Sequence, residues 1–336
     1  MKHPNKGWAR LSLALLLTAL GATTAQAQLL KDPQWQGWLD AGKTQELEHA
    51  AQARLAVQPE DAQAAVALGL AALEGGEARR LEAAIKPLQA CADRSPASAL
   101  CLYALGSVQG VQAMNGGMMK AIRLSGPIKD NLVRAVELDP LLYPAREALT
   151  QFYLMAPGVA GGSVAKAREL AQAAQARQPE HAKLLRALIA SQDKQWAEME
   201  RELSMLRVGE DKGLQSAARE AWAQLGQRML ADQQFPKARS IFEQLQREQP
   251  SQAIGPYGLA RVMTETAQPD EAIRLLERAR ALDGADKLPI DHRLGIALLA
   301  KGDKAQARVA LERFVGNKKA NPRNLEDAKK RLAELG

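Results

Sequence analysis

Residues 37–44 read GWLDAGKT, which matches the G-x-x-x-x-G-K-[ST] pattern of a loop that wraps nucleotide phosphates. Such a loop must follow a buried strand of a parallel sheet, because the sheet and the next helix hold its backbone N–H groups around the phosphates. The segment before Gly37 is LLKDPQWQ, which is polar and contains a proline, and no strand is predicted after it. We therefore expect no nucleotide binding. Gly42 and Lys43 instead form a turn between two helices, and Thr44 caps the second helix.

Two other features that could carry chemistry also lack the partner residues that their chemistry needs. Ser163 and Lys166 spell S-x-x-K, the nucleophile pair of penicillin-recognising enzymes, but neither S-D-N nor K-T-G follows. A serine that caps a helix and a solvated lysine explain this pair better. The histidines form no H-E-x-x-H pattern and no close pair with cysteine: His3, His49, His181 and His292. The sequence predicts no catalytic residue, no cofactor and no metal.

The first 27 residues have the layout of a secretory signal peptide. Three basic residues precede an apolar run over residues 11–22, and Ala25-Gln26-Ala27 follows as a small-x-small cleavage site. A retained membrane anchor is the alternative, but a run of 12 residues is shorter than the roughly 20 that cross a bilayer. No cysteine lies near the cleavage site, so we do not expect a lipoprotein. We expect cleavage after Ala27, no stable membrane span afterwards, and a periplasmic or secreted protein.

The charge of the chain gives no reason to expect nucleic acid as a partner. The formal net charge is +7, and removing residues 1–27 removes three positive and no negative side chains. Basic and acidic residues are mixed along the chain, and aromatic residues make up only 4%. Nucleic-acid binding needs a concentrated basic stripe, with aromatic side chains where single strands are bound.

The chain reads as all-α and repetitive. Ala, Leu, Gln, Arg and Glu dominate, and β-branched residues are scarce, which favours helices over strands. A proline lies nine residues before a leucine in five segments: Pro59 and Leu68, Pro96 and Leu105, Pro140 and Leu149, Pro179 and Leu188, Pro250 and Leu259. Two further segments share the core as Leu225-Gly226 and Leu294-Gly295. Such a recurring register indicates a repeat array.

The second half of each unit has its own register. Small residues lie twelve positions after Gly226, Ala260 and Gly295, and a large apolar residue follows four positions later: Ala238 and Phe242, Ala272 and Leu276, Ala307 and Leu311. This pattern resembles the tetratricopeptide repeat, an antiparallel helix pair that stacks on its neighbours. The resemblance implies a right-handed α-solenoid of about seven to eight degenerate helix pairs over residues 33–316. Residues 1–27 are the signal peptide, and residues 317–336 a C-terminal capping helix.

Two loop insertions interrupt the regular spacing of the solenoid. MNGGMMKAIRLSGP adds residues within the pair that begins near Ser98, and MAPGVAGGSVAKA adds residues after Leu154. Insertions in repeat arrays often carry binding, so Met118 and Met119 are candidate partner contacts. The alternative is that the methionines pack beneath a long loop. The two insertions together resemble a recurring type of exported bacterial repeat protein, which implies no defined activity.

The resemblance implies a non-catalytic scaffold that binds a protein or peptide partner through its concave face, and we expect the insertion loops to take part. In this repeat family the residues two before and two after the register leucine face that surface. Carried over, the candidates are Tyr103, Ser107, Glu147, Gln151, Arg186, Gln227, Tyr257, Arg261 and His292. The alternative is a cell-envelope hydrolase or transferase on a helical scaffold, for which the chain offers no motif.

The two cysteines are expected to form a disulfide. Cys91 lies five residues before Pro96 and Cys101 five residues after it, so the two face each other across an antiparallel helix turn. An oxidising compartment favours the bridge. Two buried free thiols that act as small apolar side chains are the alternative.

Overall fold

The computed structural model describes residues 28–317 and 320–335, and within these ranges the chain is helical without any β-strand. The described helices form eight antiparallel pairs and a closing helix. The first helices of the pairs are α1 (Pro33–Asp40), α3 (Ala62–Gly75), α5 (Ala99–Asn115), α7 (Tyr143–Met155), α9 (Pro179–Gln192), α11 (Lys212–Ala231), α13 (Ile254–Glu265) and α15 (Ile290–Lys301).

The second helices and the closing helix complete the array. They are α2 (Thr44–Val57), α4 (Ala78–Arg94), α6 (Gly117–Leu138), α8 (Val164–Ala174), α10 (Trp196–Ser204), α12 (Phe235–Glu248), α14 (Pro269–Arg280), α16 (Lys304–Val315) and α17 (Pro322–Glu334). Two short 3-10 turns, η1 (Gly158–Ala160) and η2 (Ala285–Lys287), lie in the connections. The architecture is a tetratricopeptide-type α-solenoid, as the sequence predicted.

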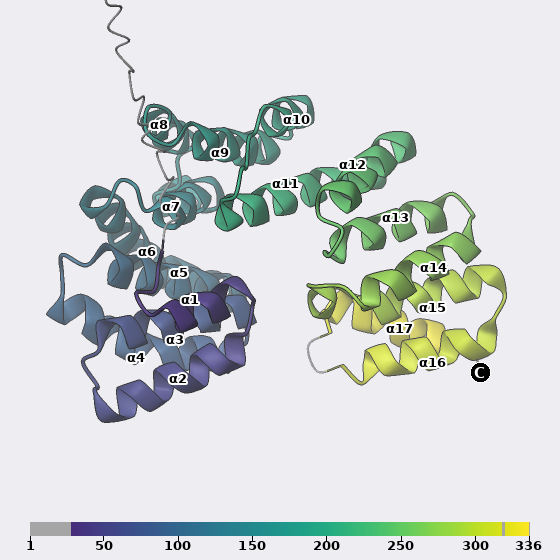
Figure 1. Cartoon of the computed structure of the whole chain (residues 1–336), viewed down its shortest axis with the longest axis horizontal. Helices are drawn as coiled ribbons and strands as arrows, with labels where there is room; N and C mark the ends of the chain where they lie inside the picture. Colours follow the sequence, from purple (N-terminus) through teal and green to yellow (C-terminus); the bar gives the residue numbers. More distant parts are fainter. Residues whose placement is uncertain (1–27, 318–319, 336) are drawn as a thin grey trace, which may run out of the picture.

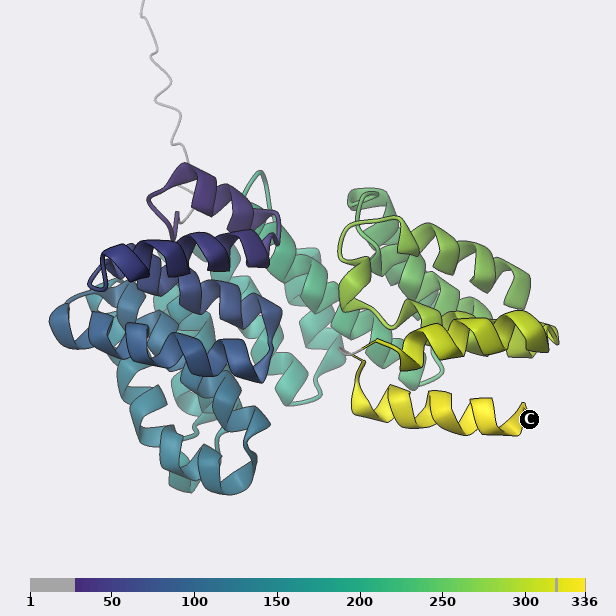
Figure 2. The ribbon, with the colours of Figure 1, turned by 90° about the horizontal axis from the view of Figure 1, so that it is seen from below.

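The first helices contact one another in order along the array, from α1 and α3 to α13 and α15. We call the surface that they share the inner wall. Figure 1 shows the array curving from α1–α6 on the left, past α7–α10 at the top and along α11, to α12–α17 on the right. Seen from below, the same two ends of the array lie apart (Figure 2). The curvature turns the first and last pairs toward each other.

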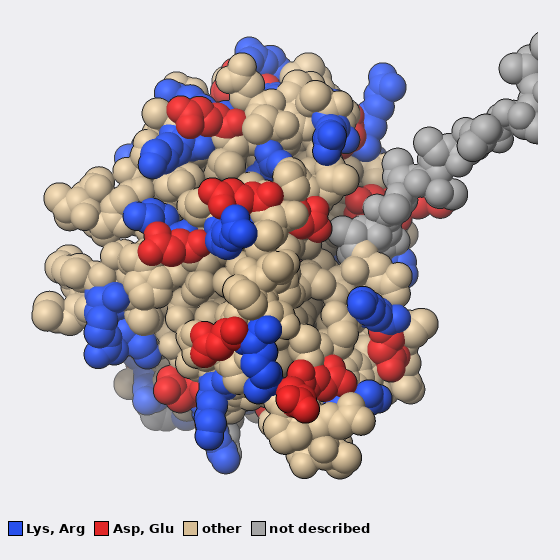
Figure 3. Space-filling model, turned by 90° about the vertical axis from the view of Figure 1, so that its left-hand side faces the viewer, with Lys and Arg blue, Asp and Glu red and all other residues tan. Residues whose placement is uncertain are grey.

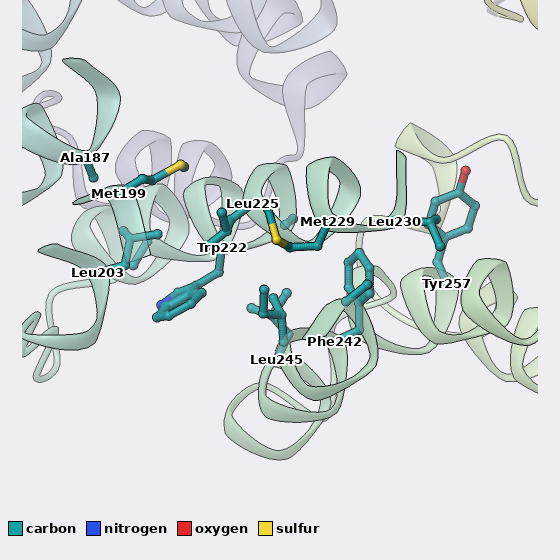
Figure 4. Close-up of a cluster of buried hydrophobic side chains, with 14 of the residues drawn as sticks. Ala187, Met199, Leu203, Trp222, Leu225, Met229, Leu230, Phe242, Leu245 and Tyr257 are labelled. Carbon is teal, nitrogen blue, oxygen red and sulfur yellow. The ribbon is translucent and has the colours of Figure 1, made fainter. Parts of the chain in front are cut away.

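Small residues let the helices approach closely, as the register predicted. Gly226 and Gly258 lie on either side of the Phe242 ring, and a Cβ at either position would come within 2.8 Å and 2.1 Å of it. Phe242 is fully buried. Figure 4 shows it reaching toward α11, beside Met229. A larger side chain at either glycine would therefore force this helix crossing apart.

Gly42 lies in the turn between α1 and α2 with φ +66, a conformation that glycine adopts at little cost. The phosphate-loop motif is thus an interhelical turn, as predicted. The predicted cap by Thr44 is wrong. Thr44 is the first residue of α2, and its Oγ1 accepts a hydrogen bond from Arg80 at 3.3 Å. Arg80 projects from α4. The Thr44 hydroxyl that could have capped α2 is therefore bonded to a residue distant in the sequence.

Cys91 and Cys101 form the predicted disulfide. It joins α4 to α5, with the two α-carbons 5.7 Å apart. Both residues are buried. The bridge therefore fixes the packing of the helices on either side of the turn at Pro96.

The first insertion is not a loop. Its residues extend α5 to Asn115 and begin α6 at Gly117, so that the pair consists of two long helices joined by a tight turn. The second insertion is an irregular connection that contains η1. Gly161 adopts φ +94 there, and Ser163 accepts a hydrogen bond from the N–H of Lys166, which caps α8 as predicted.

Candidate functional site

Acidic and phenolic side chains gather on the part of the inner wall that runs from α3 to α11. Glu74 lies at the end of α3, Tyr103 on α5, Glu147 on α7 and Glu220 on α11. Burial and the charges of Glu147 and Glu74 raise the pKa of Tyr103. These residues come from four first helices, so their mutual influence shows that they face one shared space. We call these four residues the acidic cluster.

Glu147 is the most perturbed carboxyl group of this cluster. Burial, and then the negative charge of Glu220, raise its pKa from 4.5 to about 7, although a hydrogen bond with Tyr143 lowers it. Burial also raises the pKa of Glu220. Desolvation disfavours the charged form of a carboxyl group, and a cation brought close would favour it. The acidic cluster is thus suited to receive a positively charged group.

One cation from the far end of the array already reaches this cluster. Lys287 of η2 donates a hydrogen bond from its Nζ to Glu74 at 2.9 Å, across 213 positions of sequence. Burial lowers the pKa of Lys287, but Glu74 and Glu220 outweigh that effect and raise it. Both side chains remain exposed to solvent, so the contact joins the two ends of the curve only weakly.

Two arginines lie together on the C-terminal half of the inner wall. Burial, and then the charge of Arg293, lower the pKa of Arg261. The Nε of Arg293 is buried and has no hydrogen-bond partner in the described part of the chain. Neither guanidinium forms an ion pair with a described carboxylate. We call Arg261 and Arg293 the arginine pair; it is suited to bind a carboxylate or another planar anion.

The structure divides the predicted concave-face residues into two groups. Tyr103 and Ser107 of α5 lie near Glu147, while Gln151 and Gln227 are exposed on the inner helices. Arg261 belongs to the arginine pair. The candidates Met118 and Met119 are exposed and do not pack beneath a loop.

Three predicted inner-wall residues are engaged elsewhere. Arg186 bonds Glu202 at 2.9 Å and Gln175 at 2.7 Å, and so ties α9 to its neighbours. Tyr257 is only 4% exposed and belongs to the core. His292 is 2% exposed, because its Nε2 lies 2.7 Å from Asp327 of α17 and its ring packs on Phe314. The prediction that His292 lines an open groove is therefore wrong.

Sequence reasoning missed several inner-wall residues. Tyr143 and Glu74 lie six positions from their register leucines, one helical turn beyond the predicted positions on the same face. Extending the register by one turn would have found both. Lys287 lies in a 3-10 turn outside any register, and no pattern in the sequence signals it.

Neither a metal site nor a membrane span emerges from the described residues. Within residues 28–317 and 320–335, no three His, Cys, Asp or Glu side chains are grouped so as to hold a metal ion. In the same ranges, no helix combines the length and apolar composition that crossing a bilayer requires.

Comparison with known proteins supports the fold. Residues 229–289 match the family model described as Tetratricopeptide repeat. The crystal structure of yeast Tom70 aligns with a TM-score of 0.62 and 14% identity, over 87% of this chain and 58% of that one. A tetratricopeptide repeat protein from Parabacteroides merdae aligns with a TM-score of 0.44 and 18% identity, over 87% and 98% of the two chains.

No curated protein matches the sequence of this chain. The likeness to Tom70 extends over most of the solenoid, but at 14% identity it concerns the fold alone. The family match covers a pair and a half of helices in the most regular part of the array, where the register was also clearest. The chain thus folds as a tetratricopeptide-type solenoid, and its residues 229–289 are similar to the tetratricopeptide-repeat family.

Proposed function

We propose that the protein is an exported, non-catalytic scaffold whose inner wall binds an extended segment of a protein partner. Tetratricopeptide scaffolds are typical of protein–protein interaction. The observation that carries the proposal is the division of charge on the inner wall. The acidic cluster extends from α3 to α11, and the arginine pair follows it on α13 and α15. A bound segment would place a basic side chain against the first and an acidic group against the second.

The energetic reason is that Glu147, Glu220 and the arginine pair form no ion pair within the described residues, and Glu74 pairs only with the exposed Lys287. Partly dehydrated charges gain more from a new ion pair than charges that water fully solvates. A carboxylate that meets two guanidinium groups can form parallel hydrogen bonds, which also fix its orientation. The division of charge therefore favours one direction of a bound peptide over the other.

Peptides of defined charge test this proposal. A fluorescent peptide with a basic and an acidic end is titrated with the protein, and binding is followed by anisotropy. We expect the double variant Arg261→Gln and Arg293→Gln to weaken binding by about tenfold or more, because one charge-assisted contact contributes roughly 1.5–3 kcal/mol. The exposed pair Arg247→Gln and Arg278→Gln changes the net charge equally and serves as the matched control.

The outcome distinguishes a specific site from general charge attraction. Equal weakening by both double variants would show that only the net charge matters, which would contradict the proposal. A peptide with its two charged ends reversed should bind less tightly to the unchanged protein. If it binds equally well, the inner wall does not select a direction.

Export is part of the proposal and needs its own test. The expected cleavage after Ala27 falls on residues outside the described part of the chain. The intact mass of the protein recovered from a bacterial periplasm should correspond to a chain that begins at Gln28. Recovery of the uncleaved chain in the cytoplasm would contradict export.

The alternative of a cell-envelope hydrolase or transferase is tested by activity. Proteins of this fold are generally non-catalytic scaffolds. We expect no turnover when the protein is incubated with cell-wall glycans and peptides. Turnover abolished by Glu147→Gln, with the fold intact, would favour the enzyme instead.

A further inference from the structure

The turn between α5 and α6 exposes an unusual group of apolar side chains. The four are 58–82% exposed: Met114 59%, Met118 79%, Met119 82% and Ile122 58%. Met118 and Met119 each lie one helical turn from Ile122, so they share a face of α6. We call these four residues, together with Lys120 and Arg123, the methionine tip. None of its residues belongs to the acidic cluster or to the arginine pair.

The tip extends beyond the packed part of the array. The α5 and α6 helices contain 17 and 22 residues, whereas the neighbouring α3 and α7 contain 14 and 13. The first fully buried residue of α6 is Ile128, and in the turns before it only Ala121 and Leu124 pack partly against the core. Figure 2 shows the blue-teal helices of this region extending below the neighbouring pairs at the lower left.

The charge around the tip is of one sign. No acidic residue occurs between Asp93 and Asp130, although the chain contains 38 of them. Neither Lys120 nor Arg123 forms an ion pair with any described carboxylate. Two described carboxylates of this region have partners of their own: Glu82 of α4 accepts a hydrogen bond from Gln112, and Asp130 of α6 lies 3.7 Å from Lys129.

Elsewhere on this side of the molecule, both charges are present. Figure 3, which looks at the side that carries α5 and α6, shows blue and red interspersed over the middle of this face. A surface that combines exposed apolar side chains with unpaired cations is complementary to an apolar layer that carries anionic groups at its boundary.

We propose that the methionine tip docks on the surface of an anionic lipid bilayer. The apolar side chains enter the boundary between headgroups and acyl chains, and Lys120 and Arg123 lie at the lipid phosphates. Peripheral helices bind membranes through this combination of an apolar face and basic residues. A stable protein interface involves about 20–30 residues on each side, far more than the six of the tip. A bilayer deforms around a small convex tip and needs no complementary groove.

Vesicle binding tests the proposal. The protein chain beginning at Gln28 contains every described helix and excludes the apolar segment 11–22, which would insert by itself. It is mixed with vesicles of phosphatidylcholine alone, or of equal parts phosphatidylcholine and phosphatidylglycerol, and the bound fraction is measured by flotation. We expect binding to the anionic vesicles, weaker binding to the neutral ones, and release at high salt.

Two double variants separate the apolar from the electrostatic contribution. Lys120→Gln with Arg123→Gln should lower the partition coefficient by about thirtyfold, as expected for two cations at an anionic surface. Met118→Ser with Met119→Ser should lower it by about tenfold or more. The matched controls are Lys329→Gln with Lys330→Gln on α17, and Val57→Ser on α2, all at exposed positions. Circular dichroism checks that each variant keeps its helices.

Three outcomes would overturn the proposal. The first is the absence of binding to anionic vesicles, and the second is equal loss of binding in the tip variants and their controls. The third concerns a photoreactive side chain placed at Met119. If it cross-links to a protein of the envelope and not to lipid, the tip binds a protein. Arg261→Gln with Arg293→Gln should leave vesicle binding unchanged, so a failure here is distinct from a failure of the proposed peptide site.

Discussion

The α11–α13 region and the α5–α6 pair use apolar side chains in opposite ways. In the first, Phe242 is fully buried between two glycines of neighbouring helices. In the second, Met119 is 82% exposed on turns that no neighbouring pair covers. Both segments are regular helices, so secondary structure alone does not distinguish them. The difference teaches that an apolar side chain in a solenoid is core only where an adjacent pair reaches it.

Among the variants that test this comparison, the largest expected effect is on the free energy of unfolding. Phe242→Ala should lower the free energy of unfolding by about 4 kcal/mol, because it leaves a cavity at a crossing that two glycines make tight. Met118→Ala with Met119→Ala should change it by less than about 0.5 kcal/mol. Chemical denaturation followed by circular dichroism measures both. A comparable loss in the methionine variant would show that the tip packs against something after all.

The disulfide is expected to have the next largest effect. It closes a loop with a sequence separation of 10, beside the pair that carries the tip. Replacing both cysteines with alanine should lower the free energy of unfolding by about 2–3 kcal/mol in the chain-entropy account. A reductant should then destabilise the natural protein and leave the double variant unchanged. Equal sensitivity of the two proteins would mean that the bridge contributes nothing.

The acidic cluster should make stability depend on pH. Burial raises the pKa of Glu147 to about 7 in the folded protein, above its ordinary value of 4.5. Its favourable contribution is therefore fully present below the unfolded pKa and is lost as the pH rises through the folded pKa. Glu147→Gln should stabilise the protein at about pH 8, on the order of 1–2 kcal/mol, and have little effect at about pH 4.

The exposed Glu312→Gln on α16 is the matched control for this pH dependence. It removes the same charge from a solvated position, so its stability difference from the natural protein should be small at both pH values. Parallel pH profiles for the natural protein and Glu147→Gln would contradict the assignment of the raised pKa to Glu147.

The smallest expected effect is at the turn between α1 and α2. Lys43→Ala should leave the response to Mg-ATP and Mg-GTP unchanged, because Gly42 and Lys43 join two helices and the described part of the chain contains no parallel sheet. Thermal denaturation with and without nucleotide measures this. A nucleotide-dependent shift that disappears in the variant would show that the motif binds phosphate.

Much of the fold could be predicted because its determinants are local. The spacing of leucines and small residues marks the helix faces, and Gly226 and Phe242 meet as the register implied. The disulfide was predictable because its two cysteines flank one turn. The α5–α6 insertion was predicted as a loop that contains Gly116 and Gly117, yet these glycines join two long helices, and α6 continues through Pro127.

The sequence by itself determined which residues face inward within each pair, since a helix repeats every 3.6 residues wherever it lies. Only the tertiary structure decided which inward positions stay accessible. Small rotations from pair to pair accumulate into the curve that brings Lys287 to Glu74. At the end of the array, α17 supplies Asp327 to His292 and buries it. Packing between distant segments sets both outcomes, and no local spacing encodes it.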